Sequence, residues 1–193
     1  MDKEQLERIV EEVKNGSLDQ FELIIEALQQ PIFTYCYHML GQWQEAEDAV
    51  QEVLIKAYEN IDKYTQSLSF SAWVYKIAYH HCLNALHRKR LYRFVPFLKW
   101  GMHDQSQDNT ASSVDEEYIS DPLHKALSTL STDDRNLILL RVLEEKGYEE
   151  LSQMLNKKPA ALRKQYERAI KRCKLHYHKQ KGGKIDESIR AIH

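Results

Sequence analysis

The chain is poor in the residues that mark turn-rich and sheet-rich folds. Its 193 residues include 6 glycines, 4 prolines and 3 cysteines. So few glycines and prolines favour helices over a sheet with many tight turns. Three widely spaced cysteines do not suggest a disulfide framework, and they favour a reducing compartment. The sequence therefore predicts an all-α protein located in the cytoplasm.

Signals of membrane proteins and of catalytic sites are also missing. No apolar run reaches the roughly 18–20 residues that cross a bilayer, and the charged, amphipathic start MDKEQLERIVEEVK is unlike a secretory signal. The sequence contains no glycine-rich phosphate loop and no nucleophile elbow. We therefore expect no membrane insertion, no cofactor and no catalytic residue, and the chain is predicted not to be an enzyme.

Histidines and cysteines gather at two places without predicting a metal site. His80, His81 and Cys82 are consecutive, and adjacent helical residues point about 100° apart, so they do not readily share one ion. Cys173 and His176 supply only two ligands, too few for a structural zinc site. A metal-dependent enzyme is therefore the weaker alternative, and no metal ligand is predicted.

Charge is unevenly distributed along a chain whose net charge is −2. Residues 1–95 carry 10 basic and 14 acidic side chains, and residues 96–120 carry 1 and 5. Residues 121–181 carry 14 basic and 8 acidic side chains. An acidic first half and a basic second half indicate two different partners. A solvated surface with a chance imbalance is the simpler alternative.

The first half has the hydrophobic periodicity of consecutive helices. In DAVQEVLIKAYENI the apolar residues recur at the i, i+3, i+4 spacing of an amphipathic helix, and this stripe consists of Val50, Val53, Leu54, Ala57, Tyr58 and Ile61. An apolar stretch before it contains Pro31, which predicts a bend or a new helix, and ends at Gly41, a plausible helix stop. Residues 62–69 are rich in turn formers, and residues 70–90 read as a long helix ending in a basic cluster.

Composition then divides the chain into two helical domains. The first spans residues 1–95 and the second spans residues 121–181. Residues 96–120 have the polar, acidic composition of a flexible linker. Residues 182–193 begin with two glycines and are expected to form a tail.

A helix-turn-helix pattern occupies residues 148–174. A short helix is predicted to end at Asn156, which tolerates a left-handed cap, and Pro159 suits the first position of the next helix. That second helix, about 10–12 Å across, fits the major groove of DNA. Its polar face carries side chains suited to base edges and phosphates: Lys157, Lys158, Arg163, Lys164, Glu167, Arg168, Lys171 and Arg172. A charged hairpin with a solvated face is the simpler alternative.

Three stretches follow one another in an informative order: AEDAVQEV at 46–53, the helix at 70–90, and residues 127–169. In that order, around an acidic linker, they resemble the core-docking motif, the promoter-melting helix and the DNA-reading domain of a bacterial sigma-70 factor. The resemblance is to the extracytoplasmic-function (ECF) subfamily. It implies a sigma factor that binds core RNA polymerase and directs promoter-specific transcription initiation in a stress or envelope response.

The resemblance also assigns roles to individual residues. Those expected to bind the clamp of the largest polymerase subunit are Asp48, Gln51, Glu52 and Val53. Those expected to bind the −10 element, partly through an unpaired base at loop 62–69, are Lys63, Tyr64, Gln66, Ser69, Lys76, Tyr79, His80, Arg88, Lys89 and Arg90. Those expected to bind the −35 element are Lys157, Lys158, Arg163, Lys164, Glu167, Arg168 and Lys171.

The implied partners are core RNA polymerase, promoter DNA and a possible anti-sigma factor. Asn156 stands where the family usually has glycine, and Pro159, Ala160 and Ala161 replace a more polar opening of the recognition helix. These departures leave the promoter sequence open. Two alternatives also stay open: a helix-turn-helix regulator that acts without core polymerase, and a helical adaptor with no DNA role.

Overall fold

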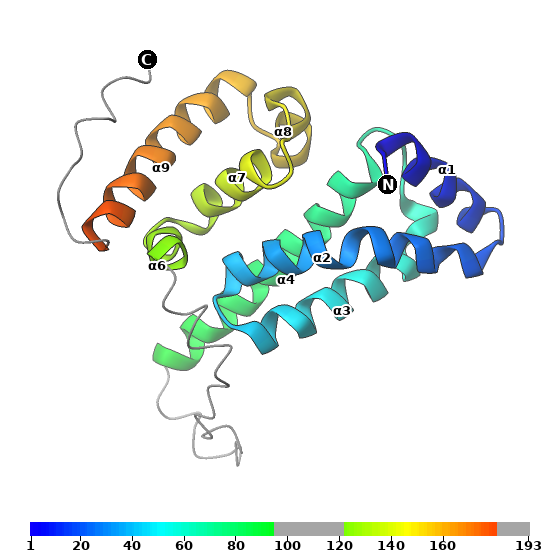
Figure 1. Cartoon of the computed structure of the whole chain (residues 1–193), viewed down its shortest axis with the longest axis horizontal. Helices are drawn as coiled ribbons and strands as arrows, with labels where there is room; N and C mark the ends of the chain where they lie inside the picture. The colour runs from blue at the N-terminus through cyan, green and yellow to red at the C-terminus, as the bar shows by residue number, and fades with distance from the viewer. Residues whose placement is uncertain (95–121, 181–193) are drawn as a thin grey trace, which may run out of the picture.

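The computed structural model describes residues 1–94 and 122–180, and every regular element in those ranges is helical (Figure 1). This confirms the predicted all-α class. The first group of helices is α1 Lys3–Lys14, η1 Leu18–Gln20, α2 Phe21–Leu40, α3 Trp43–Glu59, η2 Ile61–Lys63 and α4 Phe70–Phe94. The second group is α6 Pro122–Ser128, α7 Thr132–Val142, α8 Tyr148–Leu155 and α9 Pro159–Gln180.

The predicted linker, 96–120, and the predicted tail, 182–193, lie outside the described residues. The division into two domains therefore stays a prediction. The structure nevertheless contains the helices from which those two domains would be built.

The first group has its core between α2, α3 and α4, with α1 packed across one end (Figure 1). Tyr35, Phe70 and Tyr75 are among the largest fully buried side chains. From α3, the predicted stripe of Val50, Val53, Leu54 and Ala57 is buried in this core. Tyr58, which belongs to the same predicted stripe, is instead 40% exposed. Its ring packs edge to face on the ring of Phe21, with 4.9 Å between the ring centroids.

The helix ends follow local chemistry. Pro31 lies inside an unbroken α2, so the alternative of a new helix starting there is wrong. Gly41 ends α2 with φ 83°, and Asn156 ends α8 with φ 51°, both in the left-handed region predicted for such caps. Pro159 is the first residue of α9, as expected from its fixed φ and missing amide hydrogen.

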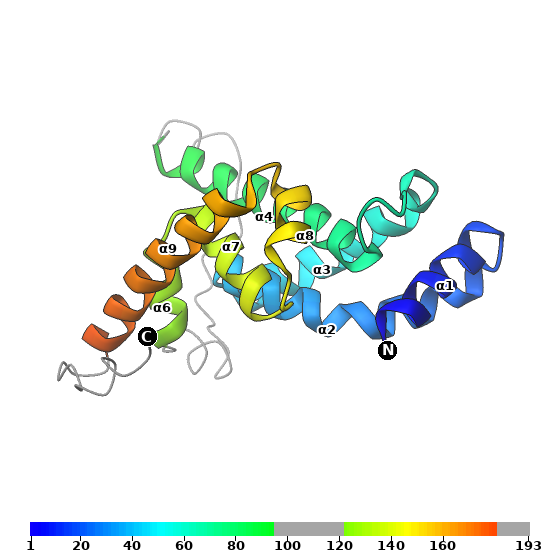
Figure 2. The same ribbon diagram turned by 90° about the horizontal axis from the view of Figure 1, so that it is seen from above.

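The second group packs against α2 and α4 along a polar seam (Figures 1 and 2). Asn136, only 1% exposed, accepts a hydrogen bond of 2.7 Å from the Tyr35 hydroxyl. Arg135, 8% exposed, donates to the carbonyls of Met39 (2.7 Å) and Leu127 (3.0 Å). The Met39 carbonyl is among the last of α2, which lack partners within the helix, and a cation is favoured at that end.

We expect Gly41→Ala to lower the free energy of unfolding by at least about 1–2 kcal/mol, because a left-handed residue with a Cβ is strained. An added Cβ would also lie 2.6 Å from His124 Nε2. Urea denaturation of the full chain measures the change.

Gly147→Ala is the matched control. Gly147 has φ −66°, and a Cβ there meets nothing within 4 Å. Its effect should stay within about 0.5 kcal/mol. Equal losses of stability in the two variants would contradict the explanation.

Candidate functional site

The outer face of α3 presents three of the four predicted polymerase-binding residues. Asp48, Gln51 and Glu52 are exposed. Glu52 makes only an exposed ion pair with Lys56, at 3.4 Å, which contributes little to stability. Val53 is 0% exposed, so its expected contact with a partner is wrong for this conformation. The reason is helical periodicity, which places Val53 on the buried stripe rather than beside Gln51 and Glu52.

Next to this face lies an apolar groove that the sequence did not predict. It lies between α2 and α3 and has a volume of about 950 Å³. Leu18 (55%), Ile55 (53%) and Tyr58 (40%) line it and expose much of their apolar surface. Ile55 is an apolar residue that lies outside the buried i, i+3, i+4 stripe of α3. An apolar residue off that stripe was the one sign in the sequence that α3 exposes apolar surface.

The loop before α4 does not present all the side chains expected to meet an unpaired base. Lys63 and Gln66 are exposed, but Tyr64 is 1% exposed. The Tyr64 ring packs on Phe70 and Trp73, and its hydroxyl lies 2.7 Å from Glu7 Oε2. Burial, together with the bond to Glu7, raises the pKa of Tyr64 above its ordinary value. Base stacking by Tyr64 is therefore wrong for this conformation.

Ser69 is also buried, at 6% exposure. Its hydroxyl accepts a hydrogen bond from the backbone amide of Ala72 (3.3 Å), and this bond helps to start α4. The same hydroxyl donates a hydrogen bond to Glu150 of α8 (2.7 Å). A nucleotide can reach neither side of this hydroxyl while α8 stays in place. The expected contact of Ser69 with an unpaired base is therefore wrong for the conformation described.

Along α4, the predicted basic surface is largely open. Lys76, His80, Arg88 and Arg90 are not buried. A groove of about 1150 Å³ runs between α3 and α4, and His80 and Arg88 line it together with Lys63 of the preceding loop. Asp48 and Glu52 of α3 line the opposite part of this groove. The part that carries Lys63, His80 and Arg88 suits the backbone of a single strand.

Two other members of the predicted −10 set already have partners. Lys89 forms an ion pair with Glu45 at 2.5 Å. The Tyr79 hydroxyl donates to Asp133 of α7 at 2.8 Å. Burial, followed by this bond, raises the pKa of Tyr79 to about 12, and the same bond lowers the pKa of Asp133.

The recognition helix, α9, lies on the outer side of its group, away from α1–α3 (Figures 1 and 2). It turns Leu162, Ala169 and Cys173 inward, while Tyr166 is half-buried. All seven side chains of the predicted −35 set are exposed: Lys157, Lys158, Arg163, Lys164, Glu167, Arg168 and Lys171. Their binding to DNA stays a prediction, but the structure leaves every one of them accessible.

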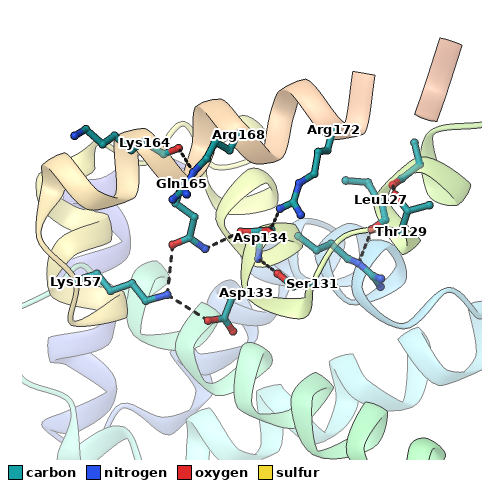
Figure 3. A network of polar contacts seen from close by, with 12 residues as sticks. Leu127, Thr129, Ser131, Asp133, Asp134, Lys157, Lys164, Gln165, Arg168 and Arg172 are labelled. Carbon is teal, nitrogen blue, oxygen red and sulfur yellow. Dashed lines mark hydrogen bonds and ion pairs between the residues drawn. The ribbon is translucent and has the colours of Figure 1, made fainter. Parts of the chain in front are cut away.

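A polar network holds α9 onto α7 (Figure 3). Asp134, 8% exposed, accepts a hydrogen bond of 2.8 Å from Gln165 and forms an ion pair with Arg172. Lys157 reaches Asp133 at 3.2 Å and Gln165 Oε1 at 3.4 Å. Asp134 therefore holds α9, the helix expected to read the −35 element, in place on α7. The sequence did not predict this role, because an acidic residue in a first helical turn is ordinarily explained by the helix dipole.

No helix within residues 1–94 and 122–180 is both long and apolar enough to cross a membrane. Within the same ranges, no three histidine, cysteine, aspartate or glutamate side chains come together as potential metal ligands.

Comparison with known proteins identifies both helical groups. The family model described as Sigma-70 region 2 matches residues 24–92, and the model described as Sigma-70, region 4 matches residues 120–173. The ECF RNA polymerase sigma factor SigW of Bacillus subtilis (strain 168) is 28% identical over 159 residues, covering 78% of this chain and 85% of that protein. The ECF RNA polymerase sigma-E factor of Haemophilus influenzae is 26% identical over 160 residues, covering 77% and 82%.

Two solved structures share the fold. The sigma factor RpoE from Bartonella quintana, in complex with the anti-sigma factor NepR, has a TM-score of 0.61 and 23% identity, covering 81% of this chain and 95% of that one. CnrH, in complex with the cytosolic domain of CnrY, has a TM-score of 0.64 and 16% identity, covering 86% and 93%.

We expect Asp134→Ala to lower the free energy of unfolding by about 1–3 kcal/mol, because Gln165 would be left without its buried charged acceptor. Denaturant titration of the full chain measures the change. Glu149→Ala removes an exposed acid and should change the same quantity by less than about 0.5 kcal/mol. A stability for Asp134→Ala equal to that of the control would show that the network does not hold α9.

Proposed function

This chain belongs to the extracytoplasmic-function subfamily of sigma-70 factors, and we propose from that premise which of its surfaces meet the polymerase and the promoter. It is a sigma factor that binds core RNA polymerase and directs promoter-specific transcription initiation in a stress or envelope response. Proteins of this family are transcription initiation factors rather than enzymes. We place its action in the cytoplasm, where polymerase and promoter DNA are found.

The docking surface for core polymerase is the outer face of α3 together with the adjacent apolar groove. Asp48, Gln51 and Glu52 offer exposed acceptors to arginine and lysine side chains of the clamp of the largest subunit. Ile55 and Tyr58 offer apolar surface beside them. An apolar centre with a charged rim is the usual composition of a specific protein interface.

The −35 element is read by α9. The observation that supports this most directly is the exposure of all seven candidate side chains. Five of them lie on α9, which the Asp134 network holds in place, and Lys157 and Lys158 lie in the turn before it. Arg163 and Lys164 lie close to the start of α9 and would enter the major groove first. The guanidinium group of Arg163 lies 5.2 Å from the Tyr148 ring, and this contact would orient it for base contact.

The −10 element is bound along the groove between α3 and α4. Lys63, His80 and Arg88 line that groove. Lys76 and Arg90 lie on α4, as His80 and Arg88 do. Lysine and arginine neutralise phosphates, which supplies affinity for a strand without dictating its sequence.

An anti-sigma factor is a further partner in this proposal. It is supported by the two solved relatives, one in complex with the anti-sigma factor NepR and the other with the cytosolic domain of CnrY. A helix-turn-helix regulator that acts without polymerase is not favoured. It would leave the match to Sigma-70 region 2, and the docking face within it, without a role.

Changing Asp48, Gln51 and Glu52 together to alanine should weaken binding to core polymerase by at least about tenfold, equal to 1.4 kcal/mol. Fluorescence anisotropy of the labelled full chain with sigma-free core measures the affinity. A matched triple variant, Glu4→Ala with Glu12→Ala and Gln30→Ala, removes two exposed acids and one exposed glutamine outside the α3 face and the apolar groove. Equal affinities for the two triple variants would contradict docking through α3.

Changing Arg163 and Lys164 to alanine should weaken promoter binding by the holoenzyme by about 1–3 kcal/mol and relax base preference in the −35 element. The salt dependence should also become shallower, by about 1 unit of slope for each phosphate that is no longer neutralised. Lys174→Ala with Lys179→Ala removes two exposed cations farther along α9 that do not belong to the −35 set. If that control pair weakened binding as much and the −35 preference stayed intact in both variants, the start of α9 would not be reading bases.

A further inference from the structure

Helix α1 meets the loop before α4 through three polar side chains on one of its faces. Glu7, Glu11 and Lys14 are four and three residues apart, so they lie on the same side of the helix. The helix packs against η2 and α4, the two elements that the loop connects (Figure 1). All the contacts of α1 with the loop therefore lie within the first group of helices.

Glu7 bridges the two ends of the loop. Its Oε1 accepts a hydrogen bond from the backbone amide of Phe70, and its Oε2 accepts one from the Tyr64 hydroxyl, each at 2.7 Å. Phe70 is the first residue of α4, so its amide has no partner within the helix, and a negative charge is favoured at that end. The Tyr64 hydroxyl also lies 2.7 Å from the Leu68 carbonyl oxygen. Glu7 thus joins residues on either side of the loop tip.

The other two side chains of this face act on the same loop. Lys14 Nζ donates to the backbone carbonyl of Tyr64 at 3.2 Å and lies 5.9 Å from the centroid of its ring. Gln66 Nε2 lies 3.4 Å from Glu11 Oε1, and the Glu11 side chain is 44% exposed, so this contact is weak. Tyr64 is therefore held by α1 at both its backbone and its hydroxyl.

The protonation of Tyr64 maintains the bridge. Burial, and then the hydrogen bond to Glu7, raises the pKa of Tyr64 above its ordinary value. The hydroxyl therefore stays protonated near neutral pH and remains a donor.

The tip between the bridged ends is exposed. Thr65, Gln66 and Ser67 all face solvent, and the hydroxyls of Thr65 and Ser67 are 3.2 Å apart. A loop that is already ordered loses less conformational entropy when a base binds to it, and its polar groups are held in fixed directions. Fixing both ends of this loop therefore favours selective contact with a base.

A simpler role for Glu7 is to hold α1 onto the first group of helices. Helix α1, however, already buries Leu6, Val10 and Val13 in the core, and apolar burial of this kind is the main contribution to such packing. A carboxylate that served only to attach α1 would not need to engage both ends of the loop.

We propose that Glu7 is a positioning residue for loop 62–69, which bridges Tyr64 and Phe70 and so orders the exposed tip, residues 65–67, before an unpaired base of the −10 element reaches it. The inference rests on the proposed function, since it takes this loop as part of the −10 surface. It gives α1, which touches neither polymerase nor DNA in that proposal, a role in promoter selection.

The test uses the full chain assembled with core polymerase. Glu7→Ala removes the bridge. Glu7→Gln retains it, because the amide oxygen accepts from Phe70 while the amide nitrogen donates to the Tyr64 hydroxyl, which then donates to Leu68. Glu12→Ala removes an exposed acid of the same helix and gives the same net charge as Glu7→Ala. Tyr64→Phe is a second variant that keeps the buried ring and removes only the hydroxyl.

Fluorescence anisotropy measures the affinity of each holoenzyme for forked fragments of a promoter that the wild-type holoenzyme transcribes. Each unpaired position of the −10 element carries the four bases in turn, and discrimination is the ratio of the highest to the lowest affinity at that position. Glu7→Ala should lower discrimination by about fivefold, the effect of one hydrogen bond, at the position that the loop contacts. Discrimination at the other positions and the affinity for core should stay within about twofold, as expected for distant sites. Tyr64→Phe should lower discrimination at the same position by less, while Glu7→Gln and Glu12→Ala should preserve it.

Unchanged discrimination in Glu7→Ala, or a loss of affinity that is equal at every −10 position, would show a purely structural role and overturn the proposal. A loss in Glu7→Gln or Glu12→Ala as large as that in Glu7→Ala would also overturn it, because both variants keep the bridge. Circular dichroism verifies folding, and if Glu7→Ala does not fold, Tyr64→Phe decides by the same criterion. A wild-type holoenzyme with no base preference at any −10 position would instead contradict the proposed function itself.

Discussion

The burial of Arg135 and Asn136 is the constraint on which the arrangement of this molecule depends. Both are polar residues removed from water, so each must find hydrogen-bond partners there. They find them on α2, at the Met39 carbonyl and the Tyr35 hydroxyl. These bonds fix α7 against the first group of helices, and α9 is held on α7 in turn. The relative positions of α4 and α9, the two helices proposed to bind DNA, therefore depend on these buried polar contacts.

The resulting molecule places its candidate surfaces facing outward and a set of hydroxyl–carboxylate hydrogen bonds facing inward, between the two groups of helices. The face of α3, the groove beside it and the basic face of α9 are all exposed. The hydroxyl groups of Ser69, just before α4, and of Tyr79, on α4, in contrast donate to acids of the second group. This distribution gives physical meaning to the uneven charge of the sequence. Acids from the basic half contact the helix that the acidic half is proposed to use for DNA.

Elements governed by local rules could be predicted from the sequence. The caps at Gly41 and Asn156, the start of α9 at Pro159 and the buried stripe of α3 each depend on a few neighbouring residues. The exposure of the polar face of α9 also follows from helical periodicity. Contacts between segments far apart in sequence could not be predicted. Tyr64 and Ser69 have the chemistry of base-binding residues, yet carboxylates distant along the chain occupy their hydroxyls.

Run-off transcription with sigma-free core polymerase tests the central claim most directly. Wild-type protein would be added to core polymerase on a library of promoter fragments from its own genome. The account predicts transcripts from a specific subset of fragments that appear only when the protein is present. No transcript and no binding to core, with duplex DNA still bound, would contradict it and would favour a regulator that acts without polymerase.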